Sequence, residues 1–238
     1  MSAAPPLLGT TAVVTGASRG IGRAIALRLG EAGADIALWA RDRETLESVA
    51  RELAARGRIA KVFVVDVADS AAVDRARDEV RATMPSVRTV VNNAGAVLRS
   101  ATAETTDADW QRVMAVNANG TFYVTRAFLP DLIREASRTG RVINIASRAG
   151  REGTPLLAAY CAAKHAVVGF TRALAAELGA GKVSVNAVCP GSVDTLMLRA
   201  GLPDASPDMT PDDIARTVEF LAVTAPPALT GSCIDVFG

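Results

Sequence analysis

Tyr160 and Lys164 lie four residues apart in a run of small and apolar residues, 156–165. On a helix, residues at this spacing share a face, so a phenol would lie beside an ammonium group. A neighbouring cation favours the phenolate, so we expect Lys164 to lower the pKa of Tyr160 from its ordinary value of about 10. Such a tyrosine could exchange a proton with a substrate near neutral pH. Because this spacing is common, its meaning depends on the residues placed around it.

The composition limits the chemistry that this pair could serve. The chain has 238 residues, half of them apolar, which fits one α/β domain spanning residues 1–238. Its 26 basic and 25 acidic side chains nearly cancel, so we expect no nucleic-acid partner. No apolar run approaches the ~20 residues that span a bilayer, and the first residues lack the features of a signal peptide. We therefore expect a cytoplasmic protein with no membrane partner.

Few residues could bind a metal ion or act as a histidine base. His165 is the only histidine, which excludes sites that need several histidines and argues against Ser-His-Asp catalysis. Cys161, Cys189 and Cys233 are odd in number and widely spaced, unlike a metal site or a disulfide framework. We expect no metal, and we expect all three cysteines to be reduced, buried, apolar side chains.

A glycine-rich segment, residues 15–22, joins the first predicted strand to a helix. Gly16, Gly20 and Gly22 would let the backbone approach a pyrophosphate closely, and the N–H groups and dipole of the helix N-terminus would favour its charge. Because the pattern follows a strand and opens a helix, it predicts dinucleotide binding rather than an ordinary turn.

The end of the second predicted strand indicates which dinucleotide binds. In sites that prefer NAD, an acidic residue here binds the ribose 2′-hydroxyl. In this chain Ala40 and Arg41 occupy the position, and Arg19 lies in the glycine-rich segment. Two guanidinium groups could hold a 2′-phosphate, whereas Asp42 would cap the next helix. We therefore expect NADP(H) rather than NAD(H).

These residues need a scaffold, and short apolar runs alternate with longer helical stretches along the chain. The predicted strands are residues 11–15, 35–39, 61–65, 89–92, 141–146, 183–188 and 232–236. The predicted helices are residues 20–32, 42–57, 69–83, 107–136, 157–178 and 211–223, with a short turn at 195–200. The strands are too short and too uniformly apolar to be half exposed, which favours a parallel sheet covered on both faces. The alternation predicts an α/β, doubly wound Rossmann-type fold.

Polar residues follow the strand ends or interrupt a helix. Asn93 follows the fourth strand, and Ser147 follows the fifth. Asn117 lies within the predicted helix 107–136, in a run of asparagine and glycine that indicates a break, because both are poor helix formers. Since ligands bind at the carboxyl ends of the strands in such a sheet, we expect these residues to converge with Tyr160 on one crevice.

The whole set of motifs resembles the short-chain dehydrogenase/reductase family, and within it the 3-oxoacyl-[acyl-carrier-protein] reductases. Taken singly, Ser147 could cap the backbone at a strand end and Asp66 could cap a helix, so the order and spacing of the set carry the resemblance. The resemblance implies a seven-stranded parallel sheet and an Asn–Ser–Tyr–Lys tetrad. The matching motifs are Thr15–Gly22, Asp66, Asn92–Gly95, Asn117, Ser147, Tyr160, Lys164 and Pro190–Gly191.

The resemblance also implies a role for each matching residue. Tyr160 would protonate the substrate oxygen, Ser147 would hydrogen-bond that oxygen, and Lys164 would lower the tyrosine pKa and hold the nicotinamide ribose. Asn117 would keep a water molecule in a proton relay to the lysine. The implied cofactor contacts are Asp66 at the adenine, Asn93 at the adenosine ribose, and Gly16, Ser18, Arg19, Gly20, Ile21, Gly22, Arg41, Val67, Ala94, Gly95, Pro190, Gly191, Val193 and Thr195.

Two segments near the tetrad predict the substrate side. Arg148 and Arg151 could meet an anionic substrate or carrier, and they could equally be solvated or paired with Glu152. The segment 191–211 is shorter than the lid usual for the family, which indicates an open cleft for a bulky or carrier-bound substrate, or a lid completed by a partner subunit. The expected pocket walls are Leu98, Leu156, Leu157, Val193 and Leu196.

The resemblance implies an NADPH-dependent reductase that converts a ketone to a secondary alcohol, with a 3-oxoacyl thioester as the leading substrate class. Two alternatives stay open: a dehydrogenase of secondary metabolism or catabolism that acts on a small or cyclic ketone, and a cofactor-binding regulator without catalysis. The predicted helix 157–178 has small apolar residues on more than one face, which predicts a second buried face. The resemblance implies that this face pairs with the same helix of a partner, in a homodimer or homotetramer. The last residues, 234–238, depart from the family's usual tail, which leaves subunit contacts there open.

Overall fold

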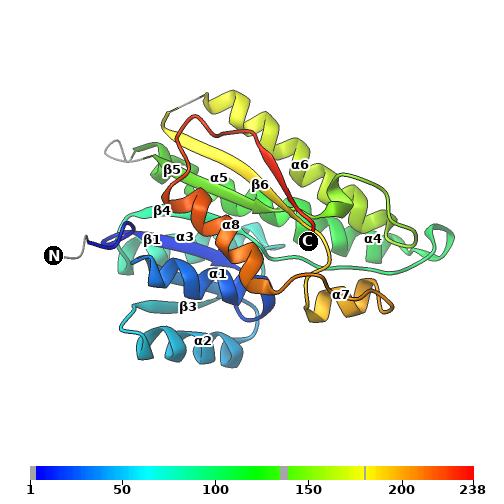
Figure 1. Ribbon diagram of the computed structural model, residues 1–238, viewed down its shortest axis with the longest axis horizontal. Helices are drawn as coiled ribbons and strands as arrows, with labels where there is room; N and C mark the ends of the chain where they lie inside the picture. Colours follow the sequence, from blue (N-terminus) through cyan, green and yellow to red (C-terminus); the bar gives the residue numbers. More distant parts are fainter. Residues whose placement is uncertain (1–3, 135–138, 180) are drawn as a thin grey trace.

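The computed structural model describes residues 4–134, 139–179 and 181–238, and strands alternate with helices along them (Figure 1). The strands are β1 (Thr11–Thr15), β2 (Asp35–Ala40), β3 (Ala60–Val64), β4 (Val87–Asn92), β5 (Gly140–Ile145), β6 (Val183–Pro190) and β7 (Cys233–Val236). The α-helices are α1 (Gly20–Glu31), α2 (Arg43–Ala55), α3 (Ser70–Thr83), α4 (Asp107–Met114), α5 (Gly120–Arg134), α6 (Ala158–Leu178), α7 (Leu196–Gly201) and α8 (Pro211–Val223).

The strands pair in parallel in the order β3-β2-β1-β4-β5-β6-β7, a seven-stranded sheet within the described ranges that confirms the predicted fold. Val13 of β1 pairs with Ala37 of β2 on one side and with Val90 of β4 on the other. The order of the strands therefore reverses between β1 and β4. In an open α/β sheet a crevice forms at such a reversal, beyond the carboxyl ends of the strands.

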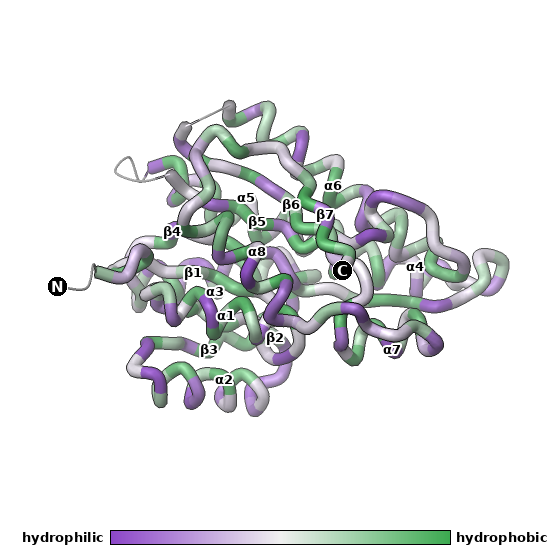
Figure 2. The backbone as a smooth tube through the Cα atoms, in the orientation of Figure 1, coloured by the Kyte–Doolittle hydropathy of each residue, from purple (hydrophilic) through white to green (hydrophobic). Residues whose placement is uncertain are grey.

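Helices cover both faces of the sheet. α1, α2 and α8 pack on one face, and α3, α5 and α6 pack on the other (Figure 1). The fully buried Trp39 of β2 contacts the ring of Phe128 in α5, with 5.6 Å between ring centroids. Along α2, hydrophilic and hydrophobic residues alternate (Figure 2), because only the side with Leu46, Val49 and Leu53 is buried. The strands between these layers must be apolar on both sides, which explains their uninterrupted apolar runs.

The helix predicted over residues 107–136 is interrupted, as its asparagines and glycine indicated. α4 is followed by a wider, π-helical turn, Ala115–Asn119, and then by α5. α5 begins at Gly120, where a Cβ would lie 2.7 Å from Val67 Cγ2, so the helix approaches the segment after β3 more closely than a larger residue would permit. Residues 135 and 136, the predicted end of this helix, lie outside the described residues.

α6 presents two different faces. Val167 and Leu174 are buried, whereas Ala166, Gly169 and Ala173 are exposed in this chain. The small exposed residues form the second face from which the sequence predicts a subunit contact, and the oligomeric state stays a prediction.

The predicted lid, residues 191–211, is a loop whose two ends are joined. Val193 and Met209 form an isolated parallel β-bridge at its base. Within the loop, Thr195 Oγ1 accepts a hydrogen bond from Leu198 N at 3.2 Å and thereby caps α7, the short helix that the sequence predicts there. In Figure 1, α7 lies at the lower right, apart from the layers that cover the sheet.

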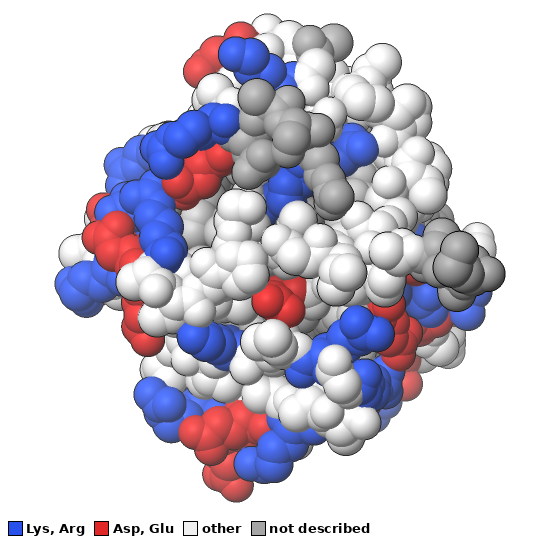
Figure 3. All heavy atoms as spheres, turned by 90° about the vertical axis from the view of Figure 1, so that its left-hand side faces the viewer, with Lys and Arg blue, Asp and Glu red and all other residues white. Residues whose placement is uncertain are grey.

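The surface carries charges of both signs. On the face shown in Figure 3, Lys and Arg side chains are mixed with Asp and Glu side chains around a largely uncharged centre. Among the described residues, no helix is both long enough and apolar enough to cross a membrane.

Candidate active site

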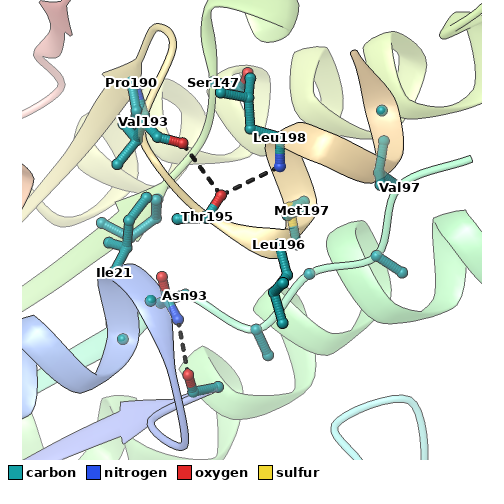
Figure 4. Close-up of a pocket in the computed structure, with 18 of the residues that line it drawn as sticks. Ile21, Asn93, Val97, Ser147, Pro190, Val193, Thr195, Leu196, Met197 and Leu198 are labelled. Carbon is teal, nitrogen blue, oxygen red and sulfur yellow. Dashed lines mark hydrogen bonds between the residues drawn. The ribbon is translucent and has the colours of Figure 1, made fainter. Parts of the chain in front are cut away.

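A cavity of about 1670 Å³ lies beyond the carboxyl ends of the strands. It is bounded by the start of α1, the segments that follow β2 to β6, the first turns of α6, and the predicted lid. Figure 4 shows Ile21, Asn93, Ser147 and Met197 around it, each contributed by a different segment. Every residue that the sequence predicts for cofactor binding lines this cavity.

The glycine-rich segment forms a backbone cradle at the start of α1. Gly16 has a φ of 64°, and a Cβ at Gly22 would lie 2.2 Å from Gly16 O, so neither position accommodates a side chain without movement. Asn93 Nδ2 holds the segment from the neighbouring strand by donating to Thr15 O at 2.9 Å. No side chain caps the first turn of α1 at Arg19. Its N–H groups can therefore bind an anion, and the cradle fits a dinucleotide pyrophosphate.

Two arginines lie where a 2′-phosphate would be bound. Arg19 and Arg41 both line the cavity, and no carboxylate pairs with either of them in the described part of the chain. Asp42, the competing acidic residue, accepts a hydrogen bond from Thr45 N at 3.2 Å and caps α2, which confirms its predicted role. The residues present therefore fit NADP(H) better than NAD(H).

Asp66 lies on the cavity wall but does not cap a helix. Its Oδ1 accepts a hydrogen bond from Ala68 N at 3.0 Å, in a tight turn after β3. The next helix, α3, is capped instead by Asp69, whose Oδ1 accepts from Ala71 N at 2.9 Å. The interpretation of Asp66 as a helix cap is wrong, and its contact with adenine stays a prediction.

Ser147, Tyr160 and Lys164 meet at one end of the cavity. Ser147 follows β5, and its Oγ accepts a hydrogen bond from Ala149 N at 3.1 Å. Tyr160 and Lys164 lie one turn apart on α6 and are both buried. Lys164 Nζ donates to Ile145 O at 2.7 Å and lies 5.7 Å from the centroid of the tyrosine ring. A hydroxyl, a phenol and a lysine thus line the same end of the cavity.

Burial, rather than mutual attraction, dominates the titration of the tyrosine and the lysine. Loss of solvent raises the pKa of Tyr160 to about 12, and a hydrogen bond with Ser147 opposes this rise. Loss of solvent also lowers the pKa of Lys164 to about 8. The expected lowering of the tyrosine pKa is therefore wrong for this structure. The ammonium group is turned toward Ile145 O, and both groups lie where the charged form is poorly solvated.

Asn117 lies just behind the cavity wall. Its Nδ2 donates to Ala96 O and to Val113 O, both at 2.8 Å. Its Oδ1 is buried and accepts no hydrogen bond from a described residue. A Cβ at Gly95 would lie 2.9 Å from this oxygen, so the asparagine is packed directly beneath the backbone of the wall. Its role in a proton relay stays a prediction.

The substrate side is only partly as predicted. Leu157 lines the cavity, but Leu98 and Leu156 do not, so their assignment as pocket walls is wrong. Leu156 is exposed and has a φ of 64°, a left-handed conformation, and its carbonyl accepts a hydrogen bond from Ser100 N at 2.9 Å. The sequence also missed Met197 of α7, whose Sδ lies 4.0 Å from the Tyr160 hydroxyl. The apolar run at the start of the predicted lid helix was its only signal.

The histidine and the three cysteines are not part of the cavity wall. His165 is exposed, and its Nδ1 lies 2.9 Å from Cys161 O in the preceding turn of α6. Cys161 and Cys189 are buried as expected, and burial raises the pKa of the Cys189 thiol to about 11. Cys233 is only half-buried, because it lies on the edge strand β7, so the expectation that it is buried is wrong.

The chain is similar to one family of proteins over most of its length. The family model described as short chain dehydrogenase matches residues 10–205. The chain is 36% identical to 2-(S)-hydroxypropyl-CoM dehydrogenase 3 of Xanthobacter autotrophicus, covering 94% of each chain. It is 36% identical to the 3-oxoacyl-[acyl-carrier-protein] reductase FabG of Pseudomonas aeruginosa, covering 98% of this chain and 97% of that protein. A solved structure of a putative NAD(P) dependent gluconate 5-dehydrogenase from Beutenbergia cavernae, with bound NADP, matches with a TM-score of 0.90 and 37% identity, covering 98% of each chain.

Proposed function

The chain belongs to the short-chain dehydrogenase family, as its motifs predicted, and from that premise we propose that it reduces a ketone to a secondary alcohol with NADPH. One observation supports this reaction best: Ser147, Tyr160 and Lys164 share a single cavity with the glycine-rich segment. A hydride donor and a proton donor could therefore reach the same carbonyl group. We propose that residues 1–238 act as one domain, with 191–211 closing over the substrate.

NADP(H) is the proposed cofactor. Arg19 and Arg41 support it, since no described carboxylate neutralises either one, and a similar solved structure contains NADP. The test is the ratio of kcat/KM with NADPH to kcat/KM with NADH. We expect this ratio to exceed one, and we expect Arg41→Ala to weaken NADPH binding by about tenfold or more, as for the loss of a hydrogen bond between charged groups. A parent enzyme that prefers NADH would contradict the proposal.

The protein's own residues stabilise and neutralise the negative charge that develops on the substrate oxygen. NADPH, when bound, supplies the hydride that the carbonyl carbon accepts. Ser147 donates a hydrogen bond to the oxygen, and Tyr160 donates its phenolic proton to it, so no free alkoxide forms. With a pKa of about 12, the tyrosine holds that proton at neutral pH. We propose that Lys164, in the next turn, holds the nicotinamide ribose and that a relay through Asn117 and Lys164 returns the proton to Tyr160.

Tyr160→Phe tests the proposed chemistry, because it removes only the phenolic hydroxyl. We expect turnover to fall by about 100- to 10,000-fold, the usual contribution of a general acid, while NADPH binding changes little. Cofactor binding is measured by NADPH fluorescence titration, and turnover by NADPH oxidation with a panel of ketones. Near-normal turnover in this variant would overturn the mechanism. If the parent protein oxidised no NADPH with any ketone, the alternative of a non-catalytic cofactor-binding regulator would hold.

Two substrate classes fit this reaction. A 3-oxoacyl thioester is favoured by the similarity to an acyl-carrier-protein reductase and by the large cavity of about 1670 Å³. A small ketone with an anionic group is favoured by Arg148, which lines the cavity directly after Ser147. The deciding experiment compares acetoacetyl-CoA with small and cyclic ketones, with NADPH and NADH run in parallel.

We propose that the protein is cytoplasmic and forms a homodimer or homotetramer. The exposed small residues of α6, Ala166, Gly169 and Ala173, support a contact between subunits, because such a face allows two helices to approach closely. Mass measurement in solution decides between the assemblies, and a monomer at all concentrations would contradict this part of the proposal.

A further inference from the structure

The two arginines that follow Ser147, Arg148 and Arg151, differ in their partners. Arg151 forms an ion pair with Asp235: its Nε lies 3.2 Å from Asp235 Oδ1, and its Nη2 lies 3.4 Å from Asp235 Oδ2. This pair joins the segment after β5 to the edge strand β7. Arg151 does not line the cavity. We assign it a structural role, and it offers a matched control for its neighbour.

Arg148 has no comparable partner. Its guanidinium carbon lies 4.4 Å from the centroid of the Phe237 ring, and its Nη2 donates a long hydrogen bond, 3.5 Å, to Phe237 O. Its Nε is buried without a hydrogen bond, and the nearest carboxylate oxygen, Glu152 Oε1, is 3.7 Å away. Its Nη1 donates a hydrogen bond to no described residue. The Glu152 side chain is 62% exposed, so water screens its charge strongly.

The stacking on Phe237 orients this guanidinium without neutralising it. A cation above an aromatic ring is held by the ring's quadrupole, and the N–H groups at the edge of the guanidinium remain available to an acceptor. A Cβ at Gly191 would lie 3.2 Å from Arg148 Nη2, so the group is also pressed against the backbone after β6. The ring and this backbone hold the guanidinium at the cavity wall.

The Arg148 side chain is 40% exposed, so its charge is open to the cavity and to solvent. Val97, Leu157, Met197 and Leu202 line the same end of the cavity as Ser147 and Tyr160. A guanidinium is suited to binding an oxyanion through two parallel hydrogen bonds.

We propose that Arg148 forms an oxyanion subsite, and that the substrate is a ketone with a carboxylate, phosphonate or sulfonate within a few bonds of its carbonyl group. The inference rests on the proposed ketone reduction and narrows its substrate class. Arg148 directly follows Ser147 in the sequence and lines the same cavity, which places the subsite on the substrate side. Phe237, the penultimate residue of the chain, serves as a positioning residue for Arg148.

The experiment compares acids with their neutral esters. The substrates are acetoacetate and 4-oxopentanoate, each beside its methyl ester, and 2-oxopropylphosphonate as the non-carboxylate anion; acetoacetyl-CoA represents the thioesters. The variants are Arg148→Met, which removes the charge at similar length, Arg148→Lys, and Arg151→Met as the control. For Arg148→Met we expect kcat/KM for the preferred acid to fall by about 10- to 100-fold, in the range of one charge-assisted hydrogen bond, and kcat/KM for its ester to change by less than about threefold. We expect Arg148→Lys to restore part of the lost kcat/KM. We expect Arg151→Met to change kcat/KM for acids and for esters by the same factor.

Three results would overturn the subsite. The parent enzyme could reduce the esters or the thioester better than every acid, or Arg148→Met could lower kcat/KM for acids and for esters by the same factor. The third result is an Arg151→Met variant that loses kcat/KM for acids as selectively as Arg148→Met does. A measurement without turnover separates this inference from the reaction. Calorimetric titration of acetoacetate, 4-oxopentanoate or 2-oxopropylphosphonate, whichever acid binds most tightly, into NADP-loaded Tyr160→Phe is compared with the same titration of the Tyr160→Phe, Arg148→Met double variant. If the double variant binds the acid at least tenfold more weakly while no ketone is reduced by the parent protein, the subsite stands and the proposed reaction fails. If both variants bind it equally, the subsite fails whatever the reaction is.

Discussion

Replacing Lys164 with methionine should make the protein more stable at neutral pH while removing its activity. Lys164 is only 4% exposed, and burial lowers its pKa from 10.5 to about 8. That difference means that the protonated lysine costs the folded state about 3 kcal/mol at pH 7. Methionine has no charge to bury, but it leaves Ile145 O without its donor, which costs about 1–3 kcal/mol. The expected net gain in the free energy of unfolding at pH 7 is about 1 kcal/mol.

The pH dependence is the sharper part of this prediction. Because the folded-state pKa is lowered, the unfolded chain binds more protons than the folded chain between about pH 8 and pH 10.5. The stability of the parent protein therefore rises with pH in that window, and Lys164→Met lacks this contribution. The free energy of unfolding of the variant minus that of the parent protein should fall by about 2 kcal/mol between pH 7 and pH 9.5. Other titrating groups, Tyr160 and Cys189 among them, cancel when the two proteins are compared at the same pH.

Urea unfolding measured at both pH values provides the assay. The fluorescence of Trp39, which is fully buried beside Phe128, reports the loss of the folded state. NADPH oxidation measured in parallel should show at least a 100-fold loss of turnover. Two results would refute the reasoning: a variant destabilised by more than about 1 kcal/mol at pH 7, or a difference between the proteins that is the same at both pH values. Either would mean that the buried ammonium is solvated better than its surroundings indicate.

Three further predictions concern the cradle, the segment before α6 and the surface. Gly22→Ala should weaken NADPH binding at least tenfold in a fluorescence titration, because a Cβ there would lie 2.2 Å from a backbone oxygen of the glycine-rich segment; Gly153→Ala, where nothing lies within 4 Å, is the control, and equal binding by both variants would contradict the cradle. Leu156→Gly should raise the free energy of unfolding by about 0.5–1 kcal/mol, because relief of its left-handed conformation outweighs the flexibility of glycine; a loss of stability would show that this conformation is not strained. Asp212→Asn should cost less than about 1 kcal/mol at pH 7, because the Arg28–Asp212 pair is half exposed. Arg28 lowers the pKa of Asp212, so this contribution is present above the ordinary value of 3.8 and is lost as the pH falls through the lowered pKa; thermal melting at pH 7 and in acid should show the difference disappear, and an unchanged difference in acid would contradict it.

The fold was predictable to within two residues at most strand ends, because strands buried on both faces leave an uninterrupted apolar run in the sequence. The interruption near Asn117 was also visible, since asparagine and glycine are poor helix formers. The π-helical hydrogen bonding of Ala115–Asn119 was not visible, because residue propensity predicts a break in a helix but not which carbonyl each N–H group will bind.

The position of the candidate site was predictable, but its electrostatics were not. Residue types and spacing located the cradle and the tetrad, since parallel strands bring their carboxyl ends to one edge. The direction in which the Tyr160 pKa shifts depends on burial and on the direction in which the lysine side chain points. Neither can be deduced from a four-residue spacing. The conformations of loops decide which side chains face the cavity, so Leu156 was wrongly included and Met197 was missed.

The bridge between Val193 and Met209 has a consequence for engineering and for the divergence of relatives. Because the two ends of the loop are joined to each other, its length and composition can change without altering the spacing of β6 and α8. Residues 194–208 therefore form an exchangeable cassette, which could be transplanted from a relative with another substrate while the sheet and the cradle stay as they are. Recombination at these two positions would let new specificities arise in a single step.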